Sequence, residues 1–233
     1  MAVTFKQLQD DTLNLTQELA DVAGFTLDVV KRQINRGYRA FVRKTGCIED
    51  VVNITTVAQQ QWYTSSDAAN IAFMYKINAV RYVDSDLGRI LRPYPGGYDN
   101  LPKTKQYGVP DWYVTQRFST KGKQRIGSWK IENAGSKVLE VKALMFPTAD
   151  LSADADQADI IDDFTDAIIW YAVWQLFSQY SHIKREWRAK ALGHKALFDG
   201  AISEYIALTF MEGAGEAPQI LDAYGDIDGL LFP

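Results

Sequence analysis

Apolar residues recur at helical spacing near the start of the chain and predict two helices. The apolar positions of the first helix lie three, seven and four residues apart: Phe5, Leu8, Leu15 and Leu19. Thr4 and Gln7 fit a capping box at its start, and Gly24 marks its end. The second helix runs from Thr26, a suitable N-cap, to Gly46. Its apolar face consists of Leu27, Val30, Ile34, Tyr38 and Phe41.

From about residue 51 to residue 146 the apolar spacing changes to every second residue, which predicts strands. The segments rich in β-branched and aromatic residues are 51–57, 70–84, 89–92, 112–118, 128–131 and 137–145. Short turns separate most of them, so we expect antiparallel hairpins. The exception, 94–110, is a long loop with prolines at 95, 102 and 110. Loops of this length are usually functional or become ordered on a partner.

Helical spacing returns near Asp159 and predicts a helix that is apolar on every side. One face carries Ile161, Phe164, Ile168, Tyr171, Ala172 and Gln175. The opposite face and one flank carry Trp170, Val173, Trp174 and Phe177. A helix that is apolar all round must be buried all round, and one small helical unit cannot easily achieve this alone. We therefore expect these last four residues to lie at a subunit interface.

A final helix is predicted over about residues 184–211, with Trp187, Ala191, Leu197, Ala201, Tyr205 and Leu208 on its apolar face. The order of elements predicts an α+β fold. Residues 1–48 and 150–212 would form a helical bundle, and residues 49–149 an inserted antiparallel β-rich subdomain. Residues 213–233 would form an extended C-terminal arm.

The predicted arm is both acidic and apolar. From Ala196 to Pro233 there is no Lys or Arg, and the acidic residues are Asp199, Glu204, Glu212, Glu216, Asp222, Asp226 and Asp228. The arm also contains large apolar residues, namely Ile220, Leu221, Tyr224, Ile227, Leu230, Leu231 and Phe232. A solvated linker would not keep so many large apolar side chains, so we expect the arm to dock on another surface.

Four arginines form a stripe along the second helix, almost opposite its apolar face. We call Arg32, Arg36, Arg39 and Arg43 the basic stripe. Such a stripe is often simply solvated. Guanidinium groups also pair with carboxylates of a neighbouring subunit or with the phosphates of DNA, and the sequence leaves these three roles open.

Composition limits the possible chemistry. The 233 residues carry a formal charge of −4, one cysteine and two histidines. A single Cys47 excludes an intrachain disulfide and a thiolate metal cage. His182 and His194 are twelve residues apart and cannot form the metal pair of a zincin helix. The chain begins without a secretory signal pattern, and its longest apolar run, 167–174, is too short for a bilayer span. We therefore predict no membrane association, no cofactor, and no catalytic or metal residues.

Two acidic motifs are better explained structurally. Asp162, Asp163 and Asp166 match the DDxxD pattern of terpene synthases, but no second metal motif accompanies it. Acidic residues also stabilise a helix N-terminus through its dipole. Asp154 and Asp156 begin like a calcium loop, which then departs from the pattern at three positions.

The order of several segments identifies a resemblance. The sequence INRGYR at 34–39 precedes a β insertion that opens near Trp62 and continues through INAVRY at 77–82 and RIL at 89–91. The segment GVPDWY at 108–113 has the form G-x-P-x-x-Y. The strand pair around 129–131 and 138–146, a stop at Pro147 and a long aromatic helix follow. Together, over about residues 4–212, the chain resembles the head-to-tail adaptor (connector) proteins of tailed bacteriophages.

This resemblance implies a structural virion protein of the neck or tail, assembled in the host cytoplasm. It implies a ring, expected to be dodecameric, beneath the portal protein. Tail or nozzle proteins would attach to this ring, and genomic double-stranded DNA would pass through its lumen without sequence-specific contacts. The arm would dock on the portal, and the loop 94–110 would face the tail side.

Two other functions remain as alternatives. The first is a phage-associated enzyme, either a cell-wall hydrolase with paired carboxylates or a DDxxD metal enzyme. Replacement of Asp162 and Asp163 by Asn would separate a structural role from metal catalysis. The second is a DNA-binding regulator, although the sequence offers no recognition-helix module.

Overall fold

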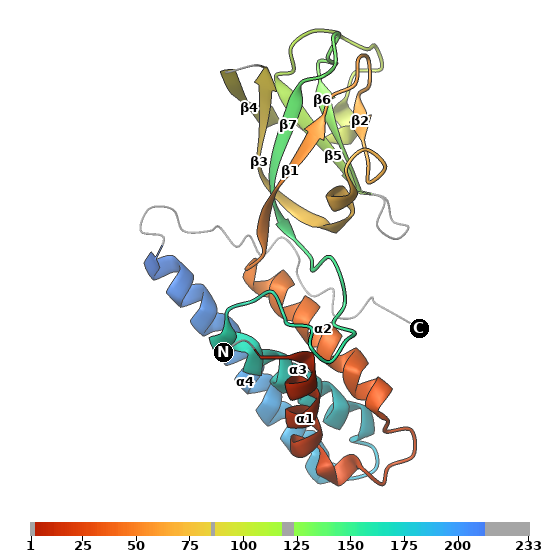
Figure 1. Cartoon of the computed structure of the whole chain (residues 1–233), viewed down its shortest axis with the longest axis vertical. Coiled ribbons are helices and arrows are strands. Elements are labelled where there is room, and N and C mark those ends of the chain that lie inside the picture. The colour runs from red at the N-terminus through yellow and green to blue at the C-terminus, as the bar shows by residue number, and fades with distance from the viewer. Residues whose placement is uncertain (1–2, 85–86, 118–123, 213–233) are drawn as a thin grey trace.

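The computed structural model describes residues 3–84, 87–117 and 124–212, with helices gathered at one end of an elongated molecule and strands at the other (Figure 1). The helices are α1 (Phe5–Leu15), α2 (Leu27–Thr45), α3 (Thr165–Tyr180) and α4 (Arg185–Glu212). The strands are β1 (Glu49–Thr55), β2 (Trp62–Tyr63), β3 (Met74–Asp84), β4 (Leu87–Pro93), β5 (Trp112–Arg117), β6 (Gln124–Trp129) and β7 (Val138–Met145). Short 3₁₀ helices are η1 (Gln17–Leu19), η2 (Ala69–Phe73), η3 (Tyr98–Asn100) and η4 (Asp162–Phe164). The predicted α+β class is confirmed.

The start of α1 and both ends of α2 follow their sequence signals. The Thr4 hydroxyl accepts a hydrogen bond from the Gln7 backbone N–H, and the Gln7 side chain accepts one from the Thr4 N–H. The Thr26 hydroxyl accepts from the Val29 N–H. Gly46 ends α2 with φ 69°, a left-handed conformation that favours glycine.

The predicted extension of the first helix to Gly24 is wrong. The helix ends at Leu15, where the Thr16 N–H is shared between the carbonyls of Thr12 and Leu13. The chain then tightens into η1, which changes the direction of the following side chains. Leu19 is consequently buried, whereas Leu15 is exposed.

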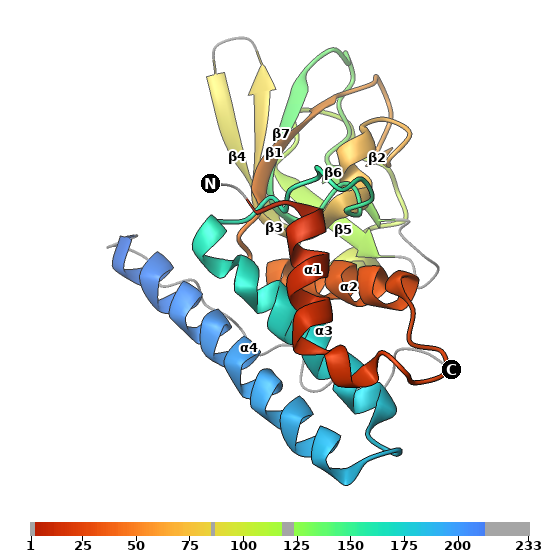
Figure 2. The ribbon, with the colours of Figure 1, turned by 60° about the horizontal axis from the view of Figure 1, so that its bottom comes forward.

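Helix α3 is the centre of the helical bundle. It lies between α2 and α4, with α1 across it (Figure 2). Its fully or nearly fully buried apolar residues come from all sides of the helix: Ala167, Ile168, Ile169, Ala172, Val173, Leu176, Phe177 and Tyr180. The helices of one chain therefore enclose most of this apolar helix without a second subunit.

Helix α4 packs on α3 through a face that differs in part from the predicted one. Trp187, Ala191, Ala201 and Tyr205 are buried as expected. Leu197 and Leu208 are exposed, and the face is completed by Phe198 and Ile202. Phe198 lies seven residues after Ala191, two full helical turns, whereas Leu197 is rotated away by about 100°.

The strands form a single seven-stranded sheet in the order β1-β7-β3-β4-β5-β6-β2. The one pair that departs from the expected antiparallel arrangement is joined by the long connection that the sequence set apart. Strands β4 and β5 run parallel, with Arg92 opposite Trp112 and Pro93 opposite Tyr113. The other pairs are antiparallel. The long connection after β4 brings the chain back beside the end of that strand, so β5 begins opposite Arg92 and continues in the same direction as β4.

Some strand limits also differ from the expected ones. Residues 69–73 form η2 and not the start of a strand. Strand β6 begins at Gln124, earlier than the predicted 128–131. The buried core of the sheet comprises Val52, Ile54, Tyr63, Ile71, Met74, Val80, Tyr82, Leu91, Ile126, Leu139, Val141, Ala143 and Met145.

The sheet is joined to the helices through adjacent strands. Strand β1 follows directly after α2, and β7 leads back through residues 146–161 to η4 and α3. β1 and β7 pair from Glu49 opposite Leu144 to Thr55 opposite Val138. The entry and exit of the β region are therefore held together by a hydrogen-bonded ladder.

Gly37 allows the close approach of α2 to α3, which gives a stability prediction. A Cβ atom at Gly37 would lie 2.9 Å from the Ile168 carbonyl oxygen and 3.2 Å from the Tyr171 ring. We expect Gly37→Ala to lower the free energy of unfolding by about 1–3 kcal/mol through overpacking. The matched control is Gly193→Ala in α4, where no atom lies within 4 Å of the new Cβ.

We expect that control to gain about 0.5–1 kcal/mol from its better helix propensity. Denaturant unfolding of both variants measures the two effects. A Gly37→Ala protein as stable as the wild type would show that the helices separate without cost.

His194 in α4 predicts a loss of stability in acid. Its Nδ1 atom is buried without a hydrogen-bond partner in the described part of the chain, and its ring stacks on Phe177. Burial lowers the pKa of His194 from the ordinary 6.5, and Lys190 acts in the same direction. Below pH 6.5 the unfolded chain therefore binds a proton before the folded chain does. Stability is full above this pH and falls as pH drops through the lower folded pKa.

Thermal unfolding above and below pH 6.5 tests this expectation. The variant His194→Phe retains a stacked ring without a titrating group, and it should show a smaller acid loss. The exposed His182 provides the control, because His182→Gln should keep the loss of the wild type. An unchanged acid loss in His194→Phe would contradict the assignment.

Candidate functional site

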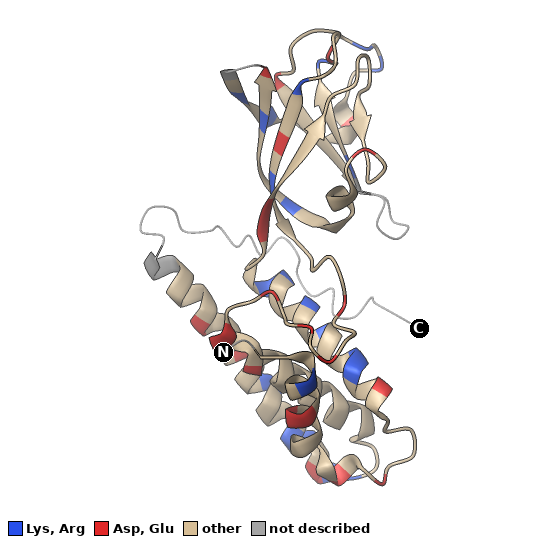
Figure 3. Cartoon of the chain, in the orientation of Figure 1, with Lys and Arg blue, Asp and Glu red and all other residues tan. Residues whose placement is uncertain are grey.

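The basic stripe lies on the outer side of α2, and its four side chains are exposed (Figure 3). Arg39 Nη2 lies 2.7 Å from Asp150 Oδ1. Within the described residues, Arg32, Arg36 and Arg43 form no salt bridge. The stripe is therefore one continuous surface, and three of its guanidinium groups have no ion-pair partner among the described residues.

The same helix holds the segment that returns from the sheet. Asn35 Nδ2 donates to the Leu151 carbonyl at 2.9 Å, and Asn35 Oδ1 accepts from the Leu151 N–H at 2.8 Å. The Tyr38 hydroxyl accepts from the Asp159 N–H at 2.8 Å. Burial raises the pKa of the Tyr38 hydroxyl to about 12, so it stays protonated at neutral pH. No role was assigned to Asn35 from the sequence. The available signal was its position inside a helix, where Asn is unfavourable and therefore indicates a specific hydrogen-bonding role.

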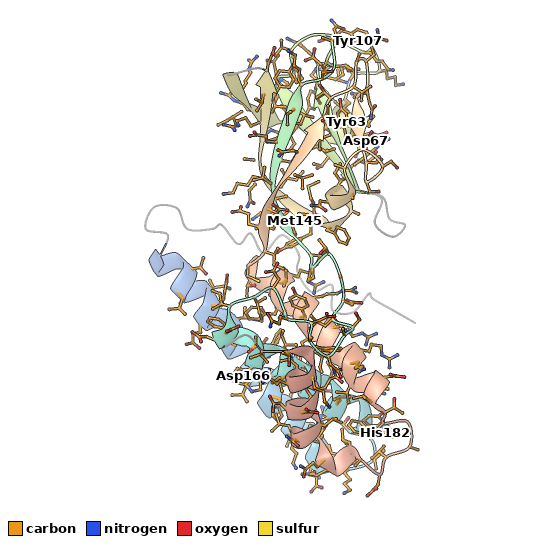
Figure 4. All side chains as sticks on the ribbon, viewed as in Figure 1. Tyr63, Asp67, Tyr107, Met145, Asp166 and His182 are labelled. Carbon is orange, nitrogen blue, oxygen red and sulfur yellow. The ribbon has the colours of Figure 1, made fainter. Side chains whose placement is uncertain are left out.

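A cleft of about 700 Å³ lies at this junction of helices and sheet. Its walls come from α2, the start of β1, the end of β7 and the return segment, and they include Tyr38, Ile48, Glu49, Asp50, Met145, Asp150 and Asp159. Figure 4 places Met145 where β7 leaves the sheet toward the helices.

The carboxylate of Asp156 in this cleft closes a turn. It accepts hydrogen bonds from the backbone N–H groups of Ser152 at 2.7 Å and Ala153 at 2.8 Å. These hydrogen bonds lower the pKa of Asp156. Asp156 therefore has a structural role, which is to stabilise the turn at residues 152–156.

The four residues predicted at a subunit interface divide into two pairs. Val173 and Phe177 are buried in the core that α1, α2, α3 and α4 form within one chain. The prediction that these two side chains contact a neighbouring subunit is wrong, because the long α4 covers the side of α3 that the sequence left open. Trp170 and Trp174 are half-buried against the cluster around Phe41, Phe164 and Phe198. Of the four residues, these two tryptophans are the ones that present part of their surface to solvent.

Aromatic and cation–π contacts hold the first part of the long loop between β4 and β5. The Arg125 guanidinium lies 4.3 Å from the centre of the Trp62 ring and 5.4 Å from that of Tyr98. Farther along the loop, Tyr107 and Val109 are exposed, and Figure 4 places Tyr107 at the end of the sheet away from the helices. This end therefore offers a second accessible surface, far from the basic stripe.

Asp111 fixes the end of the same loop through two cations. Its carboxylate lies 2.8 Å from Lys130 Nζ and 2.8 Å from Arg89 Nη2. The hydrogen bond from Lys130, together with the charge of Arg89, lowers the pKa of Asp111. This aspartate belongs to the G-x-P-x-x-Y segment, so the structure gives that segment an architectural role.

The DDxxD residues lie at the start of α3. Asp162 and Asp163 are in η4, Asp166 is in the first turn of α3, and all three are exposed. Within residues 3–84, 87–117 and 124–212, no group of three or more His, Cys, Asp or Glu side chains is arranged to hold a metal ion. Cys47 is half-buried, and burial raises the pKa of its thiol.

The predicted portal-docking residues lie outside the described part of the chain. They are Ile220, Leu221, Tyr224, Ile227, Leu230, Leu231 and Phe232. Their docking role stays a prediction.

The model of the SU10 adaptor protein family matches residues 3–219, which include all described helices and strands. The chain belongs to this family. The SU10 adaptor family comprises structural head-to-tail adaptors of phages, so the match confirms the resemblance seen in the sequence. A comparison with curated proteins finds no match.

Membership of the SU10 adaptor family makes the chain a structural phage protein of the virion neck, with portal and tail proteins as its class of partners. Among the described residues, no helix is both long and apolar enough to span a bilayer. A member of this family needs surfaces that bind other proteins. The two candidate surfaces in the described residues are the basic stripe and the exposed part of the loop around Tyr107 and Val109.

The two hydrogen bonds between Asn35 and the Leu151 backbone give a stability prediction. Asn35→Ala removes both partners of the Leu151 backbone, and we expect the free energy of unfolding to fall by about 1–3 kcal/mol. Asn14→Ala is the control, since Asn14 is exposed in α1. Denaturant unfolding measures both variants. Equal stability of the Asn35 variant and the wild type would show that the return segment needs no side-chain clamp.

Proposed function

We propose that this chain forms a ring, expected to be dodecameric, that attaches to the portal and receives tail or nozzle proteins. The observation that carries the proposal is the adaptor-family match over residues 3–219. Genomic double-stranded DNA would pass through the lumen of the ring without sequence-specific contacts. Assembly of the ring would take place in the host cytoplasm.

The shape of the molecule supports a role between two neighbours. The helical bundle and the far end of the sheet are separate regions of one elongated chain (Figure 1). If loop 94–110 faces the tail side, the exposed Tyr107 and Val109 would offer an apolar contact there. The basic stripe supports ring and channel alike, because exposed guanidinium groups bind carboxylates and phosphates.

The arm, residues 213–233, would bind the portal through its large apolar side chains. Its combination of large apolar residues and acidic charge suits docking on the surface of another protein. In this proposal the arm is required for attachment and dispensable for the fold of the helices and sheet.

The first experiment measures the native mass of the purified chain, alone and after mixing with the portal ring encoded by the same genome. Addition of many copies to the portal would support the proposal. A chain that stays single and does not bind the portal at high concentration would contradict it.

Truncation tests the arm separately. A chain that ends at Glu212 should retain its thermal stability and lose portal attachment, because the docking residues are removed. The control is a full-length chain with Asp222, Asp226 and Asp228 replaced by Asn, which keeps the apolar residues and should still attach. Normal attachment of the truncated chain would refute the assigned role of the arm.

A further inference from the structure

The basic stripe has the dimensions of a protein contact. Arg32 and Arg43 are eleven residues apart, so the stripe extends for about 16 Å along α2. Within the chain, Arg39 already binds a carboxylate, that of Asp150 at 2.7 Å. The remaining three arginines have no such partner among the described residues.

A surface of the opposite charge lies where α3 begins and α4 approaches its end. The rings of Phe164 and Tyr205 are 5.1 Å apart, which brings these two segments together. Three exposed acidic residues stand within two positions of these rings along the chain, and we call Asp163, Asp166 and Glu204 the acidic patch. Their carboxylates form no salt bridge within the part of the chain that the structure describes.

Exposed apolar side chains border the acidic patch. Ile161 is 56% exposed and stands two residues before Asp163. Leu208 is 45% exposed and lies one helical turn after Glu204. Arginine packs its aliphatic stem on apolar surface while its charged head reaches a carboxylate. The patch and its border therefore match both parts of an arginine side chain.

The two surfaces face different directions. The aromatic contacts of Phe41 with Phe164 and Tyr205 lie between them, because Phe41 is on the inner face of α2 and the basic stripe is on the outer face. In Figure 3 the basic positions of α2 and the acidic positions at the start of α3 lie on different sides of the bundle, and Figure 4 labels Asp166 on the side away from α2. One chain cannot bring its own stripe and patch into contact.

We propose that the acidic patch of one copy binds the basic stripe of the next copy, head to tail. This inference rests on the proposed ring and names the contact between its neighbours. A closed ring requires two different and complementary surfaces on each copy, and these two fulfil that requirement. DNA as the partner of the stripe would leave the acidic patch and its apolar border without a complement.

Charge exchange tests the contact. The stripe variant carries Arg36→Glu and Arg43→Glu, and the patch variant carries Asp166→Lys and Glu204→Lys. Each variant alone should associate at least about tenfold more weakly than the wild type, on the portal and in free solution, because like charges then face each other. An equal mixture of the two variants should recover association, since every junction in an alternating ring again pairs opposite charges.

Matched controls reverse the same number of charges elsewhere. Arg185→Glu with Arg188→Glu, and Asp11→Lys with Asp21→Lys, change exposed residues outside both surfaces and should leave association unchanged. Thermal unfolding verifies that each variant is folded. A chain that carries all four exchanges of the stripe and the patch should also associate with itself.

The outcomes separate the inference from the proposed function. If the stripe variant assembles normally, or if the mixture fails to recover, the contact is wrong while the ring proposal stands. Normal assembly together with weaker retention of duplex DNA would assign the stripe to the channel. A wild-type chain that does not associate under any of these conditions would overturn both.

Discussion

Burial of α3 is the constraint on which the rest of the structure depends. Nearly every side of this helix is apolar, and water contact with that surface would cost about 25 cal/mol for each Å². Helices α1, α2 and α4 cover it from three directions, although α1 and α2 precede the sheet in the chain and α4 follows it. The β region must therefore leave and return at neighbouring points, and the β1–β7 pair meets this condition.

Different faces of helix α2 contact the bundle core, the return segment and solvent. Its inner face contains Gly37, which permits close approach to α3. Its flank carries Asn35 and Tyr38, which hold the return segment at the junction. Its outer face keeps the arginines in solvent. A change in the position of α2 would consequently move the stripe and the junction together, so the packing of the core sets the geometry available for assembly.

The family match and the structure agree on a structural chain that offers surfaces to other proteins. Among its carboxylates with a lowered pKa, Asp111 and Asp156 have partners that fix loops. Two exposed regions each carry mainly one sign of charge: α2 carries the basic stripe, and the acidic patch lies at the start of α3 and near the end of α4. Such separation costs little in a monomer, because exposed charges are solvated. In the proposed contact between copies, each surface would meet its opposite.

The sequence by itself determined the elements whose signals are local. The capping box at Thr4, the glycine end of α2 and the alternating strands depend on neighbours within a few residues, and the stripe follows from the helical period. Only the tertiary structure decided which segments distant in the sequence contact each other. The sequence could not show that α4 covers Phe177, that Asn35 clamps Leu151, or that β5 runs parallel to β4. Each of these depends on which distant segment is adjacent in space, and periodicity carries no information about that choice.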